Sequence, residues 1–128
     1  MGGSVLDREA VLAANQAFYQ AFEEGNLEVM FELWEHTPRV LCTHPGWPAM
    51  HGWMHVAESW RRLMEQTERP QFIITGQRVE VVGDTAWVSC EENLLTTSMN
   101  AAVSALNVFV LGDGSWRIVA HHAGPIAR

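Results

Sequence analysis

Histidine and tryptophan residues that could serve a binding site gather in one short stretch of the sequence. Residues 41–60 read as a short buried strand, a proline-containing loop and the start of a helix, and they hold His44, Trp47 and Trp60. Imidazole titrates near neutral pH, so His44 is a candidate general base; the alternative is a ring that ties the loop by a hydrogen bond. An ionisable ring beside large aromatic side chains at a strand end indicates the mouth of a pocket.

The C-terminal part of the sequence supplies further polar candidates. If residues 112–115 form a hairpin turn, Asn107 pairs with Ala120, and strict alternation puts Ala120 and His122 on the face of Asn107. The same alternation sends His121 to the opposite face. An asparagine in a mostly apolar strand must find partners or line a wet pocket. We therefore expect Asn107, Ala120 and His122 to line the pocket.

A neighbouring strand supplies small apolar residues and one carboxylate. The alternation of Val88 and Cys90 fits a concave interior and places Glu92 inward, near the mouth of that interior. There Glu92 would polarise a histidine, unless it is a solvated carboxylate at a strand end. Nothing in the sequence around Cys90 favours a thiolate, so Cys90 and Cys42 are interpreted as reduced thiols of the core.

Tryptophan and histidine also allow other interpretations. Trp34, Trp47 and Trp60 are either core residues or walls for a flat apolar ligand, and we expect two of the three to touch the cavity. His51 and His55 have the four-residue spacing of a helical metal site, but no acidic third ligand stands at a supporting distance in the sequence. We therefore expect no metal and no cofactor.

Length and composition limit the class of protein. The 128 residues predict one domain, residues 1–128, and the hydrophobic fraction of 48% is enough for a core. The net charge of -7 and the eight Lys and Arg residues argue against nucleic acid as a partner. No apolar run reaches the roughly 18 residues of a membrane span. The N-terminus lacks a secretion signal, so we expect a cytoplasmic protein without a membrane partner.

The hydrophobic periodicity changes from helical to alternating along the chain. Helical spacing predicts helices over residues 7–24, 26–34 and 53–68, with Asp7 capping the first, Gly25 ending it and Asn26 capping the second. A short strand is expected over residues 40–43. Alternation then predicts strands over residues 71–82, 84–97, 102–111 and 115–123, with a turn near residues 98–100. Four long strands after three helices indicate an α+β fold.

Both faces of the predicted sheet are apolar. Trp87, Val103 and Val108 are expected on the face that points away from the helices, together with His121. Large contiguous apolar patches are rare on monomers, so we expect a homodimer formed through this outer face.

Three segments carry a resemblance to a known family. They are FYQAFEEGNLEVMFELW in the region of the first two helices, HPGW at residues 44–47, and GSWRIVAHHAGP near the end. In this order and spacing the chain resembles the NTF2-like superfamily, and SnoaL-like proteins within it. The resemblance covers nearly the whole chain. It implies a cone in which three N-terminal helices pack on a curved, mainly antiparallel sheet around a pocket.

The layout is also similar to that of ketosteroid isomerases, and this similarity implies roles for single residues. His44 stands at the position of their general base, Asn107 at that of one oxyanion donor, and Phe18 at that of the other donor, a tyrosine. The resemblance implies a lyase or isomerase acting on a small apolar molecule. His44 would be the base, Asn107 the oxyanion donor, and His122 an acid or orienting group.

The same resemblance leaves a second interpretation open, because the fold also hosts proteins without catalysis. A non-catalytic ligand-binding or dimerisation module would use the same pocket. The residues expected to line it, besides the three catalytic candidates, are Phe18, Trp34, Trp47, Trp60, Val88, Cys90, Glu92 and Ala120.

Overall fold

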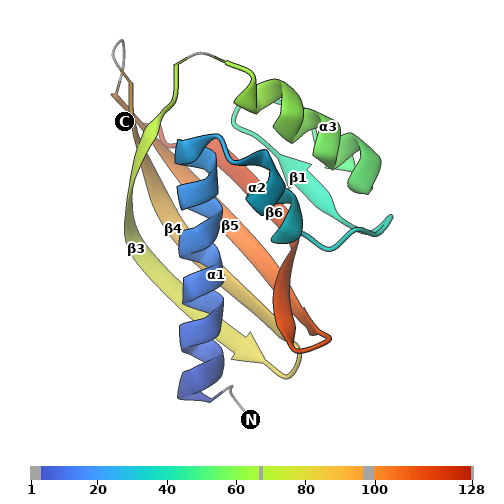
Figure 1. The fold of residues 1–128 in the computed structure, drawn as a ribbon. Helices are drawn as coiled ribbons and strands as arrows, with labels where there is room; N and C mark the ends of the chain where they lie inside the picture. Colours follow the sequence, from blue (N-terminus) through green and yellow to red (C-terminus); the bar gives the residue numbers. More distant parts are fainter. Residues whose placement is uncertain (1–3, 67, 97–99, 128) are drawn as a thin grey trace.

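The computed structural model describes residues 4–66, 68–96 and 100–127, in which three helices pack against one curved sheet of six strands (Figure 1). The helices are α1 (Val5–Glu24), α2 (Leu27–Glu32) and α3 (Trp53–Met64). The strands are β1 (Leu41–Thr43), β2 (Met50–His51), β3 (Gln71–Val82), β4 (Thr85–Leu95), β5 (Asn100–Gly112) and β6 (Ser115–Pro125). The predicted α+β class is confirmed, and the predicted turn near residues 98–100 lies mostly outside the described residues.

The ends of the first two helices follow from local hydrogen bonding. Ser4, not Asp7, caps α1: its hydroxyl accepts from the Asp7 N–H, and the Asp7 carboxylate accepts from the Ser4 N–H in return. Gly25 ends α1 with a left-handed conformation (φ 65°), as predicted. Asn26 caps α2 by accepting from the Val29 N–H, which confirms that prediction.

The sheet has the strand order β2-β1-β6-β5-β4-β3. β3 to β6 form an antiparallel meander, in agreement with the mainly antiparallel sheet that was expected, and β1 joins its edge by pairing parallel to β6. β2, a two-residue strand that the periodicity did not predict, pairs with β1. Because β1 pairs with the second half of β6, residues at the end of β1 lie beside residues 120–122.

A bulge in β6 overturns one part of the predicted register. Phe109 pairs with Ile118 as expected, but the register shifts after it, so that Val108 pairs with Ala120 and Asn107 with His121. Val119 is the extra residue. The strand therefore changes its alternation, and His121, only 2% exposed, points to the helices.

The predictions for His122 and Ala120 were consequently wrong. His122 is exposed, and Ala120 lies half-buried beside Val108 on the outer face of the sheet. Strict alternation failed because a single inserted residue inverts the facing of every later residue in a strand.

The remaining residues divide into core and outer face. Trp34, Trp60, Phe18, Phe109 and Ile118 are among the largest fully buried side chains. Val103 is buried as well, so its predicted place on the outer face was wrong: it pairs with the inward-facing Glu92. The outer face carries Trp87 and Leu106, which are 36% and 42% exposed. The homodimer through this face stays a prediction.

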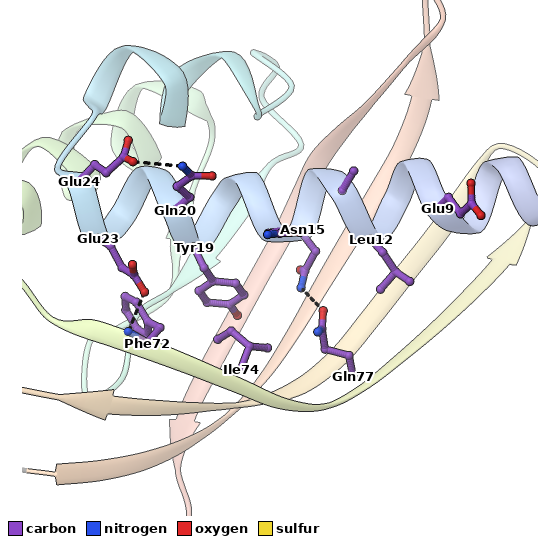
Figure 2. Close-up of a pocket in the computed structure, with 12 residues that line it drawn as sticks. Glu9, Leu12, Asn15, Tyr19, Gln20, Glu23, Glu24, Phe72, Ile74 and Gln77 are labelled. Atoms are coloured by element: carbon purple, nitrogen blue, oxygen red, sulfur yellow. Dashed lines mark hydrogen bonds between the residues drawn. The ribbon is translucent and has the colours of Figure 1, made fainter.

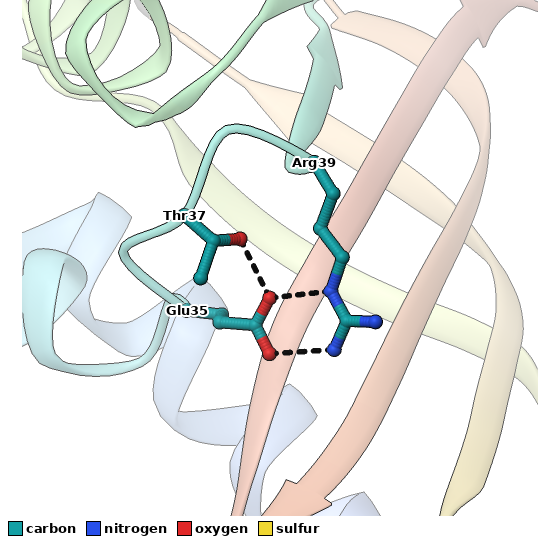
Figure 3. Close-up of polar contacts among 3 residues, drawn as sticks. All are labelled: Glu35, Thr37 and Arg39. Atoms are coloured by element: carbon teal, nitrogen blue, oxygen red, sulfur yellow. Dashed lines mark hydrogen bonds and ion pairs between the residues drawn. The ribbon is translucent and has the colours of Figure 1, made fainter.

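Hydrogen bonds of Glu35 hold the segment between α2 and β1 in place. The Glu35 carboxylate accepts two hydrogen bonds from Arg39, at 2.6 and 2.8 Å, and one from the Thr37 hydroxyl (Figure 3). The Glu35 N–H donates to the Ile118 carbonyl in β6. These bonds help fix the path of the chain that enters β1. No helix within the described residues is both long and apolar enough to span a bilayer.

Candidate functional site

A cavity of about 340 Å³ opens between the C-terminal ends of α1 and α3 and the sheet. Its apolar lining comes from Phe22, Trp47, Leu63, Phe72 and Leu94. Its titratable lining comes from His44, Glu92, His121, Glu68 and Arg69. The combination of apolar walls with a few polar groups is typical of small-molecule sites.

His44 follows β1 and is 1% exposed. Its Nε2 lies 3.0 Å from the Ser59 hydroxyl, and that hydroxyl donates to the Val56 carbonyl at 2.7 Å. A hydroxyl has one hydrogen, so His44 Nε2 donates to Ser59 and the unprotonated nitrogen of the neutral ring is Nδ1. Burial lowers the pKa of His44 to about 4, so the ring is neutral at pH 7.

His121 is held by an amide. Its Nδ1 lies 2.5 Å from Asn107 Oδ1, while Asn107 Nδ2 donates to Asn15 Oδ1 at 2.8 Å and to the Tyr19 hydroxyl at 3.2 Å. With the amide fixed in this orientation, His121 Nδ1 must donate, and Nε2 is the basic nitrogen. Burial, with smaller effects from His44 and His122, lowers the pKa of His121 to about 3.

Glu92 is a buried carboxyl beside a buried phenol. The Tyr19 hydroxyl donates to Glu92 Oε2 at 2.6 Å and lies 3.5 Å from Cys90 Sγ. Burial raises the pKa of Glu92 to about 7, although the Tyr19 hydrogen bond opposes the shift. At neutral pH the carboxyl is therefore present in both protonation states. Burial also raises the pKa of Tyr19 and that of Cys90, so both keep their protons.

Aromatic rings set the spacing of the two histidines. The ring centroids of His44 and His121 are 6.3 Å apart. The ring of Trp60 packs against both imidazoles, with centroid distances of 4.5 Å to His44 and 6.0 Å to His121. The ring of Phe18 packs on His121 at a centroid distance of 4.9 Å. Trp47 meets the edge of His44 at 5.1 Å. The rings hold the imidazoles in fixed positions and keep their surroundings apolar.

The structure separates the predicted site residues into three groups. His44, Trp47 and Glu92 line the cavity. Phe18, Trp34, Trp60, Val88 and Cys90 are buried in the core and do not contribute to the cavity surface. Ala120 and His122 lie on the other side of the sheet, and His121 takes the place that was predicted for His122.

Asn107 is buried behind His121 rather than in the cavity wall. Both of its amide hydrogens and its carbonyl oxygen are engaged by Asn15, Tyr19 and His121. An oxyanion could take such a donor only by breaking one of these bonds. In this arrangement Asn107 holds His121 and has no unbonded amide hydrogen for an oxyanion, so its role as an oxyanion donor stays a prediction that the geometry does not favour.

Asn15, Tyr19 and Ser59 were missed by the sequence interpretation. Asn15 and Tyr19 stand four residues apart on α1 and point toward β3, where Asn15 Nδ2 also reaches Gln77 at 3.4 Å (Figure 2). Residues four positions apart lie on the same face of a helix, so this spacing could have predicted that Asn15 and Tyr19 lie side by side. An open groove of about 830 Å³ lies on this side of α1, lined mainly by carboxylates and amides, and neither histidine of the cavity contributes to it.

The cavity brings together proton acceptors and a proton donor. Two neutral imidazoles each have one unprotonated nitrogen, and the Glu92 carboxyl supplies a proton when it is not ionised. This set is suited to moving a proton at a carbon atom next to a carbonyl group. Within the described residues, no three His, Cys, Asp or Glu side chains are grouped to hold a metal ion.

Comparisons with known proteins agree with this architecture. A candidate dehydratase of the NTF2-like family from Streptomyces avermitilis is 39% identical, with a TM-score of 0.90 over 96% of this chain and 98% of that one. A candidate calcium/calmodulin-dependent protein kinase type II association domain from Thiobacillus denitrificans is 30% identical, with a TM-score of 0.77 over 90% and 94% of the two chains.

A curated relative and a family match complete the comparison. The F-box protein SKIP8 of Arabidopsis thaliana is 25% identical over 114 residues, which is 89% of this chain and 48% of that protein. The chain thus spans about half the length of this relative. The SnoaL-like domain family matches residues 11–127. The chain belongs to the SnoaL-like family and has the NTF2-like fold.

Proposed function

We propose that the protein is a lyase that removes water from a small, largely apolar β-hydroxy carbonyl compound. The observation that carries the proposal is the presence of two neutral imidazoles, 6.3 Å apart, in one cavity with a carboxyl group of pKa about 7. Such a set supplies a base and an acid at the same pH. The similarity to a candidate dehydratase supports the same class of reaction.

In the proposed reaction His44 is the general base. Its unprotonated nitrogen takes the proton from the carbon next to the carbonyl group, and the electrons of that C–H bond form the C=C bond. The C–O bond to the β-hydroxyl breaks, and protonated Glu92 gives its proton to the leaving oxygen, which departs as water. Transfer of the proton from His44 to Glu92 then restores both groups. His121 accepts a hydrogen bond from the substrate and orients it.

Tyr19 and Asn107 support these groups from behind. Tyr19 occupies Oε2 of Glu92, so Oε1 is the oxygen left to carry the acidic proton. Asn107 keeps the proton of His121 on Nδ1 and leaves Nε2 as the acceptor. Positioned acid–base catalysis of this kind contributes on the order of 10²- to 10⁴-fold in rate.

The test is water loss from a panel of β-hydroxy ketones and β-hydroxy thioesters, followed by the absorbance of the conjugated product. His44→Asn should lower kcat/KM by about 10²-fold or more. His122→Asn is the matched control, because it changes the neighbouring histidine of β6 that lies outside the cavity. Turnover that survives His44→Asn but not His122→Asn would refute the assignment.

The pH profile gives a second test of the same roles. His44 must be neutral, so kcat/KM should rise as the pH passes its pKa of about 4. Glu92 must be protonated, so kcat/KM should fall as the pH passes its pKa of about 7. Glu92→Gln should lower the plateau and remove the fall near pH 7, whereas a fall that persists in this variant would assign the acid to another group.

A second candidate function is a non-catalytic association module. The similarity to a candidate association domain, at 30% identity over 90% of this chain, favours it. Such a module would associate through surfaces outside the cavity. If His44→Asn leaves self-association unchanged and no compound of the panel is converted, the association module is the better description.

A further inference from the structure

Arg69 is held at the rim of the cavity by two helix ends. Its Nη1 donates to the carbonyl of Met64, the last residue of α3, at 2.7 Å. Its guanidinium lies over Gly25, the residue that ends α1: a Cβ atom on Gly25 would come within 2.2 Å of Arg69 Cζ. Glycine therefore leaves the room that the guanidinium occupies. The head group is positioned by backbone on two sides.

Among the described residues Arg69 has no carboxylate partner, a property that it shares with Arg62, Arg78 and Arg117. Arg8, Arg39 and Arg61 each lie within 4.0 Å of a glutamate, whereas no carboxylate in the described parts of the chain lies that close to Arg69. Only one of its five N–H donors is bonded to the protein within the same residues. A guanidinium that is fixed in place and keeps free donors is suited to binding a carboxylate in a bidentate manner.

The charge of the cavity differs between its rim, where Arg69 is a cation, and its interior, where the two histidines are neutral. Arg69 is exposed, while His44 and His121 are 1% and 2% exposed. Both histidines are neutral at pH 7, so Arg69 is the permanent cation among the described residues that line the cavity. Glu68 also lines it, so recognition of an anion there depends on directed hydrogen bonds rather than on net charge.

We propose that Arg69 binds the carboxylate of an amphipathic organic acid, whose apolar body lies along Phe22, Phe72 and Leu94. The inference rests on the proposed function in one respect, because it takes this acid as the substrate of the lyase. In the bound substrate the carboxylate would lie at the rim, away from the carbon atoms that react beside His44. Binding of the anion itself requires no reaction.

The experiment compares 4-phenylbutanoate with its neutral amide, 4-phenylbutanamide, by ¹H–¹⁵N NMR titration. The two probes differ in charge and share the apolar body. The protein should bind the acid about tenfold more tightly than the amide, which is the fold-change expected for a charge-assisted pair. In Arg69→Met the two dissociation constants should become equal. Arg69→Lys should keep part of the preference, because it keeps the charge and loses the planar fork.

Arg61→Met is the matched control, because it removes an exposed arginine of α3 that does not line the cavity. Equal binding of both probes by the unchanged protein, no binding of either, or a preference that survives Arg69→Met would overturn the proposal. Neither probe has a hydroxyl group to eliminate. A preference for the acid in a protein that dehydrates nothing would therefore uphold the anion site and refute the lyase.

Discussion

The two buried histidines of the cavity are held in different ways. His44 donates from Nε2 to a single hydroxyl, Ser59, which belongs to the neighbouring helix α3. His121 donates from Nδ1 to Asn107, which is itself held by Asn15 and Tyr19 of α1. The rings therefore have opposite neutral tautomers. His44 has one hydroxyl partner and the Cys42 sulfur at 3.7–3.9 Å from its ring nitrogens, whereas His121 is held by a network of side chains. A network fixes orientation more strongly, since each member is constrained by several others.

The largest effect is expected from breaking the network. Asn107→Leu leaves His121 Nδ1–H and Asn15 Oδ1 without their partner in a buried place, at roughly 1–3 kcal/mol for each group. The free energy of unfolding should fall by about 3 kcal/mol or more in urea denaturation. Asn93→Leu is the control, because the hydrogen bonds of Asn93 are at the surface and its loss should cost far less. Equal costs for the two variants would contradict the network.

The next largest effect concerns Glu92, which shares Tyr19 with the network. Its pKa is raised from 4.5 to about 7, so the stability that it contributes below pH 4.5 is lost as the pH rises through 7. Glu92→Gln cannot ionise and should raise the free energy of unfolding at pH 8 by up to about 3 kcal/mol, with little change at pH 4. Urea denaturation at both pH values measures this, and a gain that is equal at the two pH values would not be an ionisation effect.

A smaller effect is expected from removing the anchor of His44. Ser59→Ala deletes one hydrogen-bond partner, which should cost about 1–2 kcal/mol. In the unchanged protein, ¹⁵N NMR should show the proton on Nε2 of His44 and on Nδ1 of His121. In Ser59→Ala the signal of His44 alone should move toward the other tautomer. A change at His121 of the same size would mean that the two anchors are not independent.

The smallest effect is expected at the surface, where Glu35 and Arg39 form an exposed pair (Figure 3). The hydrogen bonds from Arg39 lower the pKa of Glu35 to about 2, so its contribution is present above pH 4.5 and lost as the pH falls toward 2. Glu35→Gln should cost less than about 1 kcal/mol at pH 7, because exposed pairs are screened by solvent. A double-mutant cycle with Arg39→Gln isolates the pair, and a coupling above that value would show that the loop is more rigid than its exposure suggests.

Much of the fold could be predicted from the sequence because its signals are local. Gly25, Asn26 and the alternation of the long strands mark element ends and types within a few residues. The position of His44 at the end of a short strand before Pro45 also follows from local pattern.

The wall of the site was harder to predict because it depends on pairing over long distances. The choice between His121 and His122 depends on one extra residue, Val119, and no local propensity marks that bulge. The network around Tyr19 joins α1 to β4, β5 and β6, across about ninety residues of sequence between Asn15 and Asn107. The resemblance drew attention to Phe18, whereas the hydroxyl that donates to Glu92 belongs to the next residue, Tyr19.

The bulge at Val119 has a consequence for how this chain tolerates change during evolution. Because residues 121 and 122 are both histidine, a slip of the final strand by one position would still present an imidazole to the cavity. The side chain that then faces the cavity, His122, is also an imidazole. Whether its Nε2 is the acceptor would depend on whether its Nδ1 still donates to Asn107. Insertions or deletions in the hairpin between β5 and β6 can therefore occur with an imidazole still facing the cavity. The hydrogen bond between that imidazole and Asn107 is what such a variant would have to form again.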